Sequence, residues 1–163
     1  MIFKVSFKET DKNPSKAVKK VGKTTTVVLK GVVGLPSFWK HIPEEIMEWI
    51  GETTKVECYE NVVENTLIVY SSGISRCRPD DKYDSLLGER LAEARAKYNV
   101  YKFFYTLTYK LFEYYNRILF GDIGVVGSGS GSCLAVDVKK YAALCIKESH
   151  HIEELLKNKE ENG

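Results

Sequence analysis

The stretch DSLLGERLAEARAKYNVYKFFYTLTYKLFEYYNRILF, residues 84–120, decides the fold of this chain. Its 37 residues include no proline and hold ten of the nineteen aromatic side chains in the protein. At 100° per residue, the apolar side chains occupy two faces. The first apolar face extends along the whole predicted helix and includes Leu91 and Tyr105. The second is confined to the later half of the helix and includes Phe104 and Leu111. A helix with two apolar faces must be covered on two sides, so we expect a long helix between two packing surfaces.

A second long helix is predicted at residues 134–157, where Leu134, Tyr141 and Ile152 lie in one apolar stripe. The segment between the two helices, residues 121–132, ends in strict Gly-Ser alternation. It has neither the G-x-G-x-x-G nor the G-x-x-x-x-G-K-[ST] pattern of phosphate-binding loops. We interpret it as a flexible linker, natural or engineered, that joins the two helices of an antiparallel hairpin.

Residues 1–78 are expected to be mainly β-structure. Residues 11–22 are polar and rich in lysine, and we interpret them as a loop or flexible arm. Gly31 is expected to end a strand, and residues 71–73 are expected to form a turn. Alternating or β-branched residues predict about five short strands, at residues 3–7, 24–29, 55–60, 66–70 and 74–77.

One short helix is predicted in this half of the chain, at residues 43–50. Pro43 suits the first helical turn, and Gly51 suits the position that follows the last one. The fold class that follows is α+β: a small antiparallel sheet with one short helix, packed on the long C-terminal helical hairpin. We expect residues 1–163 to form a single domain, because this length and an apolar content of 44% suit one core.

Composition and cysteine usage favour a cytoplasmic protein. Charged residues make up 28% of the chain, and no apolar run is long enough for a membrane span. No secretory leader precedes the first alternating residues. The four cysteines stand far apart in the sequence, as expected for reduced thiols in a chain that needs no disulfides. We therefore expect no membrane partner.

The sequence contains no recognisable catalytic or metal-binding pattern. The cysteines lack the C-x₂₋₄-C spacing of structural zinc sites, and the adjacent His150 and His151 would diverge on a helix. No G-x-S-x-G motif is present, and no cysteine stands beside an obvious base. Glu89 and Glu93 share a helix face, which we interpret as a solvated surface. We predict a protein that is not an enzyme and uses no metal or cofactor.

A strip of basic side chains is the candidate binding surface. Four of them recur at intervals of seven or eight residues along the long helix, and two stand at the end of the strand before it. A basic strip attracts anionic partners, although every long surface helix also needs one polar face. The six residues are Arg76, Arg78, Arg95, Lys102, Lys110 and Arg117.

The N-terminal lysines offer a second candidate surface, formed by Lys16, Lys19, Lys20 and Lys23. Residues 1–30 carry eight lysines against two acidic residues, so the segment is strongly basic. With the basic strip and its interleaved tyrosines, these lysines could hold phosphates while the rings stack on bases. The alternative interpretation is a lysine-rich hairpin edge that discourages aggregation.

A resemblance to other proteins rests on the run GISRCRPDDKYDSLLGERLAEARA, residues 73–96, with TTTVVLK upstream at residues 24–30. The chain resembles small uncharacterised phage and prophage proteins in which a valine-rich strand precedes a second strand with a patterned end. A helix with an early glycine and later alanines then follows. The strand-end pattern, Cys-x-Pro-x-Asp-x-Tyr-Asp, is matched by Cys77, Pro79, Asp81, Tyr83 and Asp84.

The resemblance implies an origin rather than an activity. Small phage proteins without catalytic motifs often inhibit or sequester a component of bacterial defence in the host cytoplasm. Our leading hypothesis is therefore a non-enzymatic, phage-encoded inhibitor that binds a host bacterial protein such as a CRISPR effector, or that sequesters a nucleotide signal. The second hypothesis is a nucleic-acid-binding protein. The third is a self-assembling structural protein, a homo-oligomer that buries spare aromatic surface.

Overall fold

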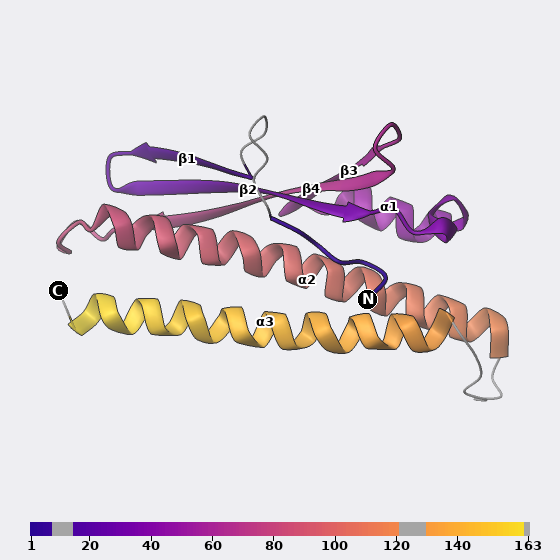
Figure 1. The fold of residues 1–163 in the computed structure, drawn as a ribbon. Helices are drawn as coiled ribbons and strands as arrows, with labels where there is room; N and C mark the ends of the chain where they lie inside the picture. Colours follow the sequence, from indigo (N-terminus) through magenta and orange to yellow (C-terminus); the bar gives the residue numbers. More distant parts are fainter. Residues whose placement is uncertain (8–14, 121–129, 162–163) are drawn as a thin grey trace.

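The computed structural model describes residues 1–7, 15–120 and 130–161, which form three layers (Figure 1). In the described chain, a four-stranded antiparallel sheet is the first layer, helix α2 (Ser85–Phe120) the second and helix α3 (Ser130–Glu161) the third. The two long helices run side by side in opposite directions, so α2 lies between the sheet and α3. The predicted α+β class, the helical hairpin and the two covering surfaces of α2 are confirmed.

The sheet has the strand order β1-β2-β4-β3, and all neighbouring strands are antiparallel. Along β2 and β4, buried positions alternate with more exposed ones, as expected for a sheet with one covered face. The covered face packs on α2. The strands are β1 (Lys16–Val21), β2 (Thr24–Gly34), β3 (Val56–Asn61) and β4 (Thr66–Arg76).

Small residues bring the first half of α2 close to the sheet. Ala92 and Ala96 are fully buried and pack against Val27 and Leu29 of β2. A Cβ atom on Gly73 of β4 would lie 1.8 Å from the carbonyl oxygen of Ala92, so only glycine permits this approach. The backbones of β4 and α2 are therefore in direct contact here.

Larger side chains fill the second half of α2. Val100, Phe104 and Leu107 are fully buried in the main core, which also contains Val69 of β4. Phe104 in addition stacks on Tyr141 of α3, with ring centroids 5.3 Å apart. The central helix thus joins the sheet and α3 into one continuous core.

The N-terminal segment is not the strand that its alternation predicted. Within the described residues 1–7, only Ser6 pairs with the sheet, in an isolated bridge to Val32. The segment is instead held by α3: the buried carboxylate of Asp137 accepts a hydrogen bond from the Phe3 backbone N–H at 2.7 Å, and the Tyr141 hydroxyl donates to the Phe3 carbonyl. The alternation was misleading because the buried Phe3 packs against Trp39 and Phe104, while Val5 lies over Gly31 of β2 without a continuous ladder to it.

Residues 16–21 were expected in a loop or arm, but they form the edge strand β1, as in the alternative interpretation of a lysine-rich hairpin edge. Its lysines alternate between the faces: Lys16 and Lys20 reach α2, whereas Lys19 lies opposite Thr26 on the uncovered face. The strand was missed because lysines occupy positions where an alternating pattern would show apolar residues. Residues 11–14 of the expected loop lie outside the described residues.

Two glycine-containing segments that were predicted to interrupt strands lie inside them. Gly31 is within β2, and residues 71–73 are within β4, so the described sheet has four strands and not about five. A Cβ on Gly31 would lie 2.7 Å from the side chain of Val5. Gly31 and Gly73 therefore make room for packed neighbours and do not turn the chain.

The predicted short helix is α1 (Glu44–Glu52), with Pro43 as its N-cap and Gly51 inside its last turn. A 3-10 helix, η1 (Ser37–His41), precedes it and was not predicted. Helix α3 begins at Ser130, so it includes the end of the predicted linker. The rest of that linker, residues 121–129, lies outside the described residues.

Candidate functional site

Among the described residues, no strand lies on one side of the last five residues of β4. The Cys77 N–H donates to the carbonyl of Lys23 at 3.0 Å, on the β2 side of β4. Because hydrogen-bonding directions alternate along a strand, Ile74 and Arg76 direct their N–H and C=O groups away from β2. On the side of β4 that faces away from β2, the pairing with β3 ends where Val56 lies opposite Ser71. In the described part of the chain, residues 72–76 therefore form an open sheet edge.

Two side chains of α2 reach this edge. Arg95 Nη1 donates a hydrogen bond to the Ile74 carbonyl at 2.6 Å, and Asn99 Nδ2 donates to the Ser72 carbonyl at 3.2 Å. The donors are one helical turn apart, and their acceptors are two residues apart on the strand. Burial lowers the pKa of the Arg95 guanidinium, but an arginine remains charged at neutral pH. The edge is therefore lined by a fixed positive charge.

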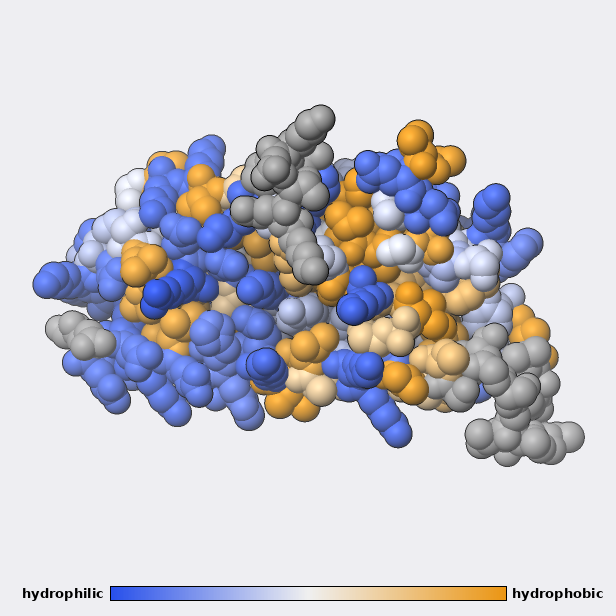
Figure 2. Space-filling view, viewed as in Figure 1, coloured by the Kyte–Doolittle hydropathy of each residue, from blue (hydrophilic) through white to orange (hydrophobic). Residues whose placement is uncertain are grey.

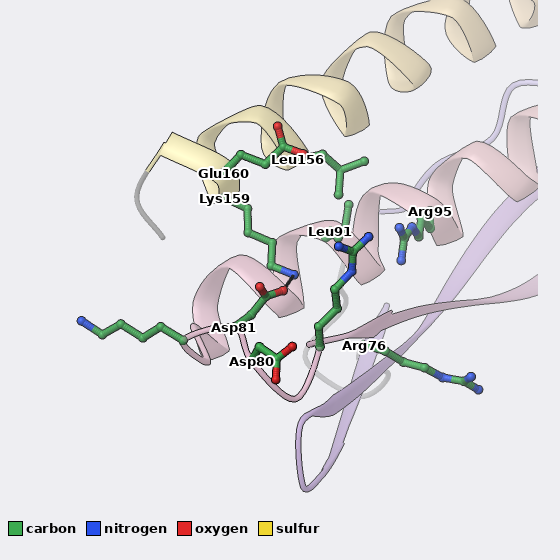
Figure 3. Close-up of a pocket in the computed structure, with 10 residues that line it drawn as sticks. Arg76, Asp80, Asp81, Leu91, Arg95, Leu156, Lys159 and Glu160 are labelled. Atoms are coloured by element: carbon green, nitrogen blue, oxygen red, sulfur yellow. Dashed lines mark ion pairs between the residues drawn. The ribbon is translucent and has the colours of Figure 1, made fainter.

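A hollow of about 430 Å³ lies at one end of the open edge, between the end of β4, the start of α2 and the end of α3 (Figure 3). Its lining includes five basic and three acidic side chains. Arg78 and Arg95 line it, and Arg76 lies at its rim with its side chain directed away in Figure 3. Lys159 reaches from α3 to Asp81, with Nζ and Oδ2 2.9 Å apart. The hydrogen bond from Lys159 lowers the pKa of the Asp81 carboxyl.

A second hollow of about 450 Å³ lies at the other end of the edge, between α2 and the segment that connects α1 to β3. Lys102 and Asn99 line it from α2, and Lys55 lines it from the connecting segment. Its apolar wall is made by Trp49 and Phe103, whose stacked rings have centroids 5.4 Å apart. Asn99 thus belongs both to this hollow and to the open edge.

We call the open edge and its two flanking hollows the edge groove. Four residues of the predicted basic strip belong to it: Arg76, Arg78, Arg95 and Lys102. The open backbone and the contributions of Asn99 and Trp49 were not found by sequence reasoning. The only available signal was that Asn99 follows Arg95 by four residues, which places both side chains on one helix face.

The other two residues of the strip lie elsewhere, beside α1. The Lys110 ammonium stands over the ring of Trp49, 5.5 Å from its centroid. Arg117 Nη2 lies 3.9 Å from the carboxylate of Glu45. Lys110 and Arg117 line a further hollow with Glu45 and Glu113, and Lys110 borders the second hollow of the edge groove through Trp49.

The N-terminal lysines are largely engaged with other parts of the protein. Lys16 pairs with Glu93 at 3.1 Å and with Glu89 at 3.2 Å, and Lys20 pairs with Glu89 at 3.3 Å. Hydrogen bonds to Glu93 and then to Glu89 raise the pKa of Lys16. Lys23 donates to the carbonyl of Pro79 at 3.0 Å. The glutamates expected to be merely solvated therefore neutralise part of this basic segment.

The protein surface also carries an apolar projection at the opposite end of β4 from Arg76. Val62 and Val63, in the turn between β3 and β4, are 77% and 95% exposed. Figure 2 shows this apolar tip, and it shows hydrophobic surface gathered over the half of the molecule that carries α1 and β3. The half near the end of α3 is mainly hydrophilic (Figure 2).

Among the described residues, no group of three or more His, Cys, Asp or Glu side chains is placed to hold a metal ion. The described helices include none with the length and apolar character needed to cross a bilayer. No protein-family model, curated protein or solved structure matches the chain at a significant level.

Proposed function

We propose that this chain is a non-enzymatic binding protein that holds an acidic surface of a partner protein in the edge groove. The observation that carries the proposal is the position of Arg78, Arg95 and Lys102. Arg95 contacts the open strand edge, Arg78 lines the hollow at one end of it, and Lys102 lines the hollow at the other end. Positive charge near a partly enclosed groove favours encounter with an acidic partner and its orientation.

The resemblance to phage proteins supports a more specific form of this proposal. A small phage protein that acts by contact would inhibit a host bacterial factor, such as an immune effector in the host cytoplasm, by covering a surface that the factor needs. Such an inhibitor requires neither a cofactor nor a catalytic group. Its affinity would come from a few anchoring contacts surrounded by complementary surface.

An acidic protein is a better candidate than a nucleic acid. Asp80, Asp81 and Glu160 also line the first hollow, and they would repel a continuous phosphate backbone. Two of the N-terminal lysines that would extend a nucleic-acid surface, Lys16 and Lys20, are held by Glu89 and Glu93. A protein partner can place its carboxylates beside the arginines and its neutral groups beside these acids.

Affinity capture from a bacterial lysate tests the proposal with two matched variants. The groove variant carries Arg78→Glu and Lys102→Glu, and the control carries Lys139→Glu and Lys140→Glu on the exposed face of α3. Both variants change the net charge equally, so a difference between them reports position and not overall charge. We expect quantitative mass spectrometry to show a protein that the wild type and the control capture and the groove variant loses.

Identical capture by the groove variant and the wild type would contradict the proposal. A labelled single-stranded DNA or RNA added to the same proteins at low salt provides the second arm. We expect no mobility shift. A salt-dependent shift that is lost in the groove variant would favour the nucleic-acid hypothesis instead.

A further inference from the structure

We propose that the open edge of β4, residues 72–76, binds an extended acidic segment of the partner protein as an additional β-strand. The inference rests on the proposed function and specifies how the partner is held. Strand addition uses backbone hydrogen bonds for affinity and side-chain pockets for specificity. The edge groove offers both.

The backbone groups needed for strand addition already face the groove. Ile74 and Arg76 direct their N–H and C=O groups away from β2, and β3 ends opposite Ser71. An added strand would continue the line of β3 past Val56. At about 3.3 Å per residue, five residues span about 16 Å, which is enough for a short strand to pair with the edge.

The edge is held in place before any partner binds. Gly73 lies directly on α2, where an added Cβ would meet the carbonyl oxygen of Ala92 at 1.8 Å and the N of Ala96 at 2.6 Å. On its other side, β4 is paired with β2 along its entire length. A preorganised strand loses little conformational freedom when a partner pairs with it, which favours binding.

The basic groups nearest the edge favour an acidic strand, and the acidic side chains of the first hollow, Asp80, Asp81 and Glu160, would lie beside its neutral positions. Arg95 donates one guanidinium N–H to the Ile74 carbonyl, and its remaining donors can meet a carboxylate. Arg78 lies at one end of the groove and Lys102 at the other. Because side chains alternate along a strand, acidic residues at every second position would all face α2 and its basic groups.

The carbonyls of Ser72 and Ile74 already accept hydrogen bonds from Asn99 and Arg95. Each carbonyl oxygen has a second lone pair, so it can also accept a bond from the N–H of an added strand. The α2 side chains thus protect the edge without closing it. This explains why an exposed edge persists in the isolated protein.

A second copy of this chain is not a suitable occupant. If two copies paired antiparallel about Ile74 of this edge, the two Arg95 guanidinium groups, each bonded to an Ile74 carbonyl, would meet at the centre of the interface. Like charges at a shared interface oppose association. An acidic segment of a different protein would instead be attracted to these arginines.

The test uses a synthetic octapeptide of alternating threonine and glutamate, added to the full chain, with amide hydrogen exchange measured residue by residue. We expect exchange at Ile74 and Arg76 to slow at least tenfold. A threonine–lysine octapeptide should give no slowing. The glutamate peptide with every second amide N-methylated should also give none, because it cannot complete the ladder. Unchanged exchange at Ile74 and Arg76 with saturating glutamate peptide would overturn strand addition.

Variants separate this inference from the proposed function. Ile74→Pro removes an N–H that faces the open edge and not β2, and circular dichroism checks that the variant folds. We expect it to lose peptide and partner binding.

If Arg78→Glu with Lys102→Glu abolishes capture while a folded Ile74→Pro variant captures normally, strand addition fails and the proposed function stands. If the peptide protects the two amides but charge reversal leaves capture unchanged, the proposed function fails. Should Ile74→Pro not fold, the exchange data alone decide.

Discussion

Gly73 determines how closely β4 approaches α2. Replacing it with alanine places a Cβ 1.8 Å from the Ala92 carbonyl oxygen and 2.6 Å from the Ala96 nitrogen, and both are backbone atoms that cannot rotate away. We expect Gly73→Ala to lower the free energy of unfolding by at least about 3 kcal/mol, at the upper end for overpacked sites. Urea unfolding measures the change.

Gly51→Ala is the matched control for Gly73→Ala. Gly51 lies within α1, and no atom from the described part of the chain lies within 4 Å of the position that an alanine methyl group would occupy. Alanine is the better helix former, so this variant should gain about 0.5–1 kcal/mol. A loss at Gly73 no greater than that of an ordinary surface substitution would show that β4 and α2 are not in direct backbone contact.

Cys58 should react more slowly with an alkylating reagent than Cys133, because the two thiols differ in burial. Burial raises the pKa of the Cys58 thiol to about 11, so a very small fraction is thiolate at pH 8. Cys133, at the start of α3, is exposed. We expect iodoacetamide at pH 8 to modify Cys58 about a hundredfold more slowly in the folded protein than in the urea-unfolded chain. Peptide mass spectrometry follows each site.

Cys133 is the internal control for the thiol experiment. Its folded and unfolded rates should differ much less than those of Cys58. Equally fast alkylation of Cys58 in the folded and unfolded protein would contradict the burial of this thiol.

At the scale of the element, β1 is held on α2 by ion pairs. Hydrogen bonds from Lys16 and then from Lys20 lower the pKa of Glu89 below its usual value of 4.5. A carboxylate with a lowered pKa stabilises the folded state above its ordinary pKa and loses that contribution as the pH falls. Because the side chains are solvent-accessible, the effect is at most about 1 kcal/mol.

Glu89→Gln tests this pH dependence. We expect the wild type to be slightly more stable than the variant at pH 7, and we expect this difference to disappear as the pH falls from 5 to 3. Thermal unfolding across that range measures it. A difference that persists at pH 3 would indicate that the glutamate acts through packing and not through charge.

The long helices were predictable because their signals are local and repeated over many residues. Residues 84–120 show helical periodicity throughout, and α2 begins one residue later than expected. The sheet was less predictable. The sequence does not show that Lys16 and Lys20 pair with a glutamate of α2, so β1 was obscured. It also does not show that the side chain of Val5 packs on Gly31, so this glycine suggested the end of a strand.

The candidate site was predictable by residue type but not by arrangement. Helical spacing aligned Arg95 with Lys102, Lys110 and Arg117, yet in the structure Lys110 and Arg117 lie beside α1, where they line a hollow of their own. The open edge depends on where β3 ends relative to β4. That register results from tertiary packing, so no local pattern in the sequence could specify it.

At the scale of the whole molecule, α2 is the structural element that the two outer layers share. The sheet packs on one side of it, and Leu155 of α3 packs with Leu91 and Ala94 on the other. Neither outer layer retains its covering surface if α2 unfolds. We therefore expect the described layers to unfold in one cooperative transition.

Two spectroscopic probes test this cooperativity. Tryptophan fluorescence reports the surroundings of Trp39 and Trp49, on the side of the molecule that carries η1 and α1. Circular dichroism at 222 nm reports mainly the long helices α2 and α3. We expect both probes to give the same urea midpoint.

Leu155→Ala removes a buried contact between α2 and α3. It should lower the free energy of unfolding by about 2 kcal/mol and shift both midpoints together. The exposed Glu154→Ala should leave both unchanged. If the Leu155 variant shifts the helical signal alone, α3 unfolds independently, and the edge groove would then rest on β4 and α2 without the support of the third layer.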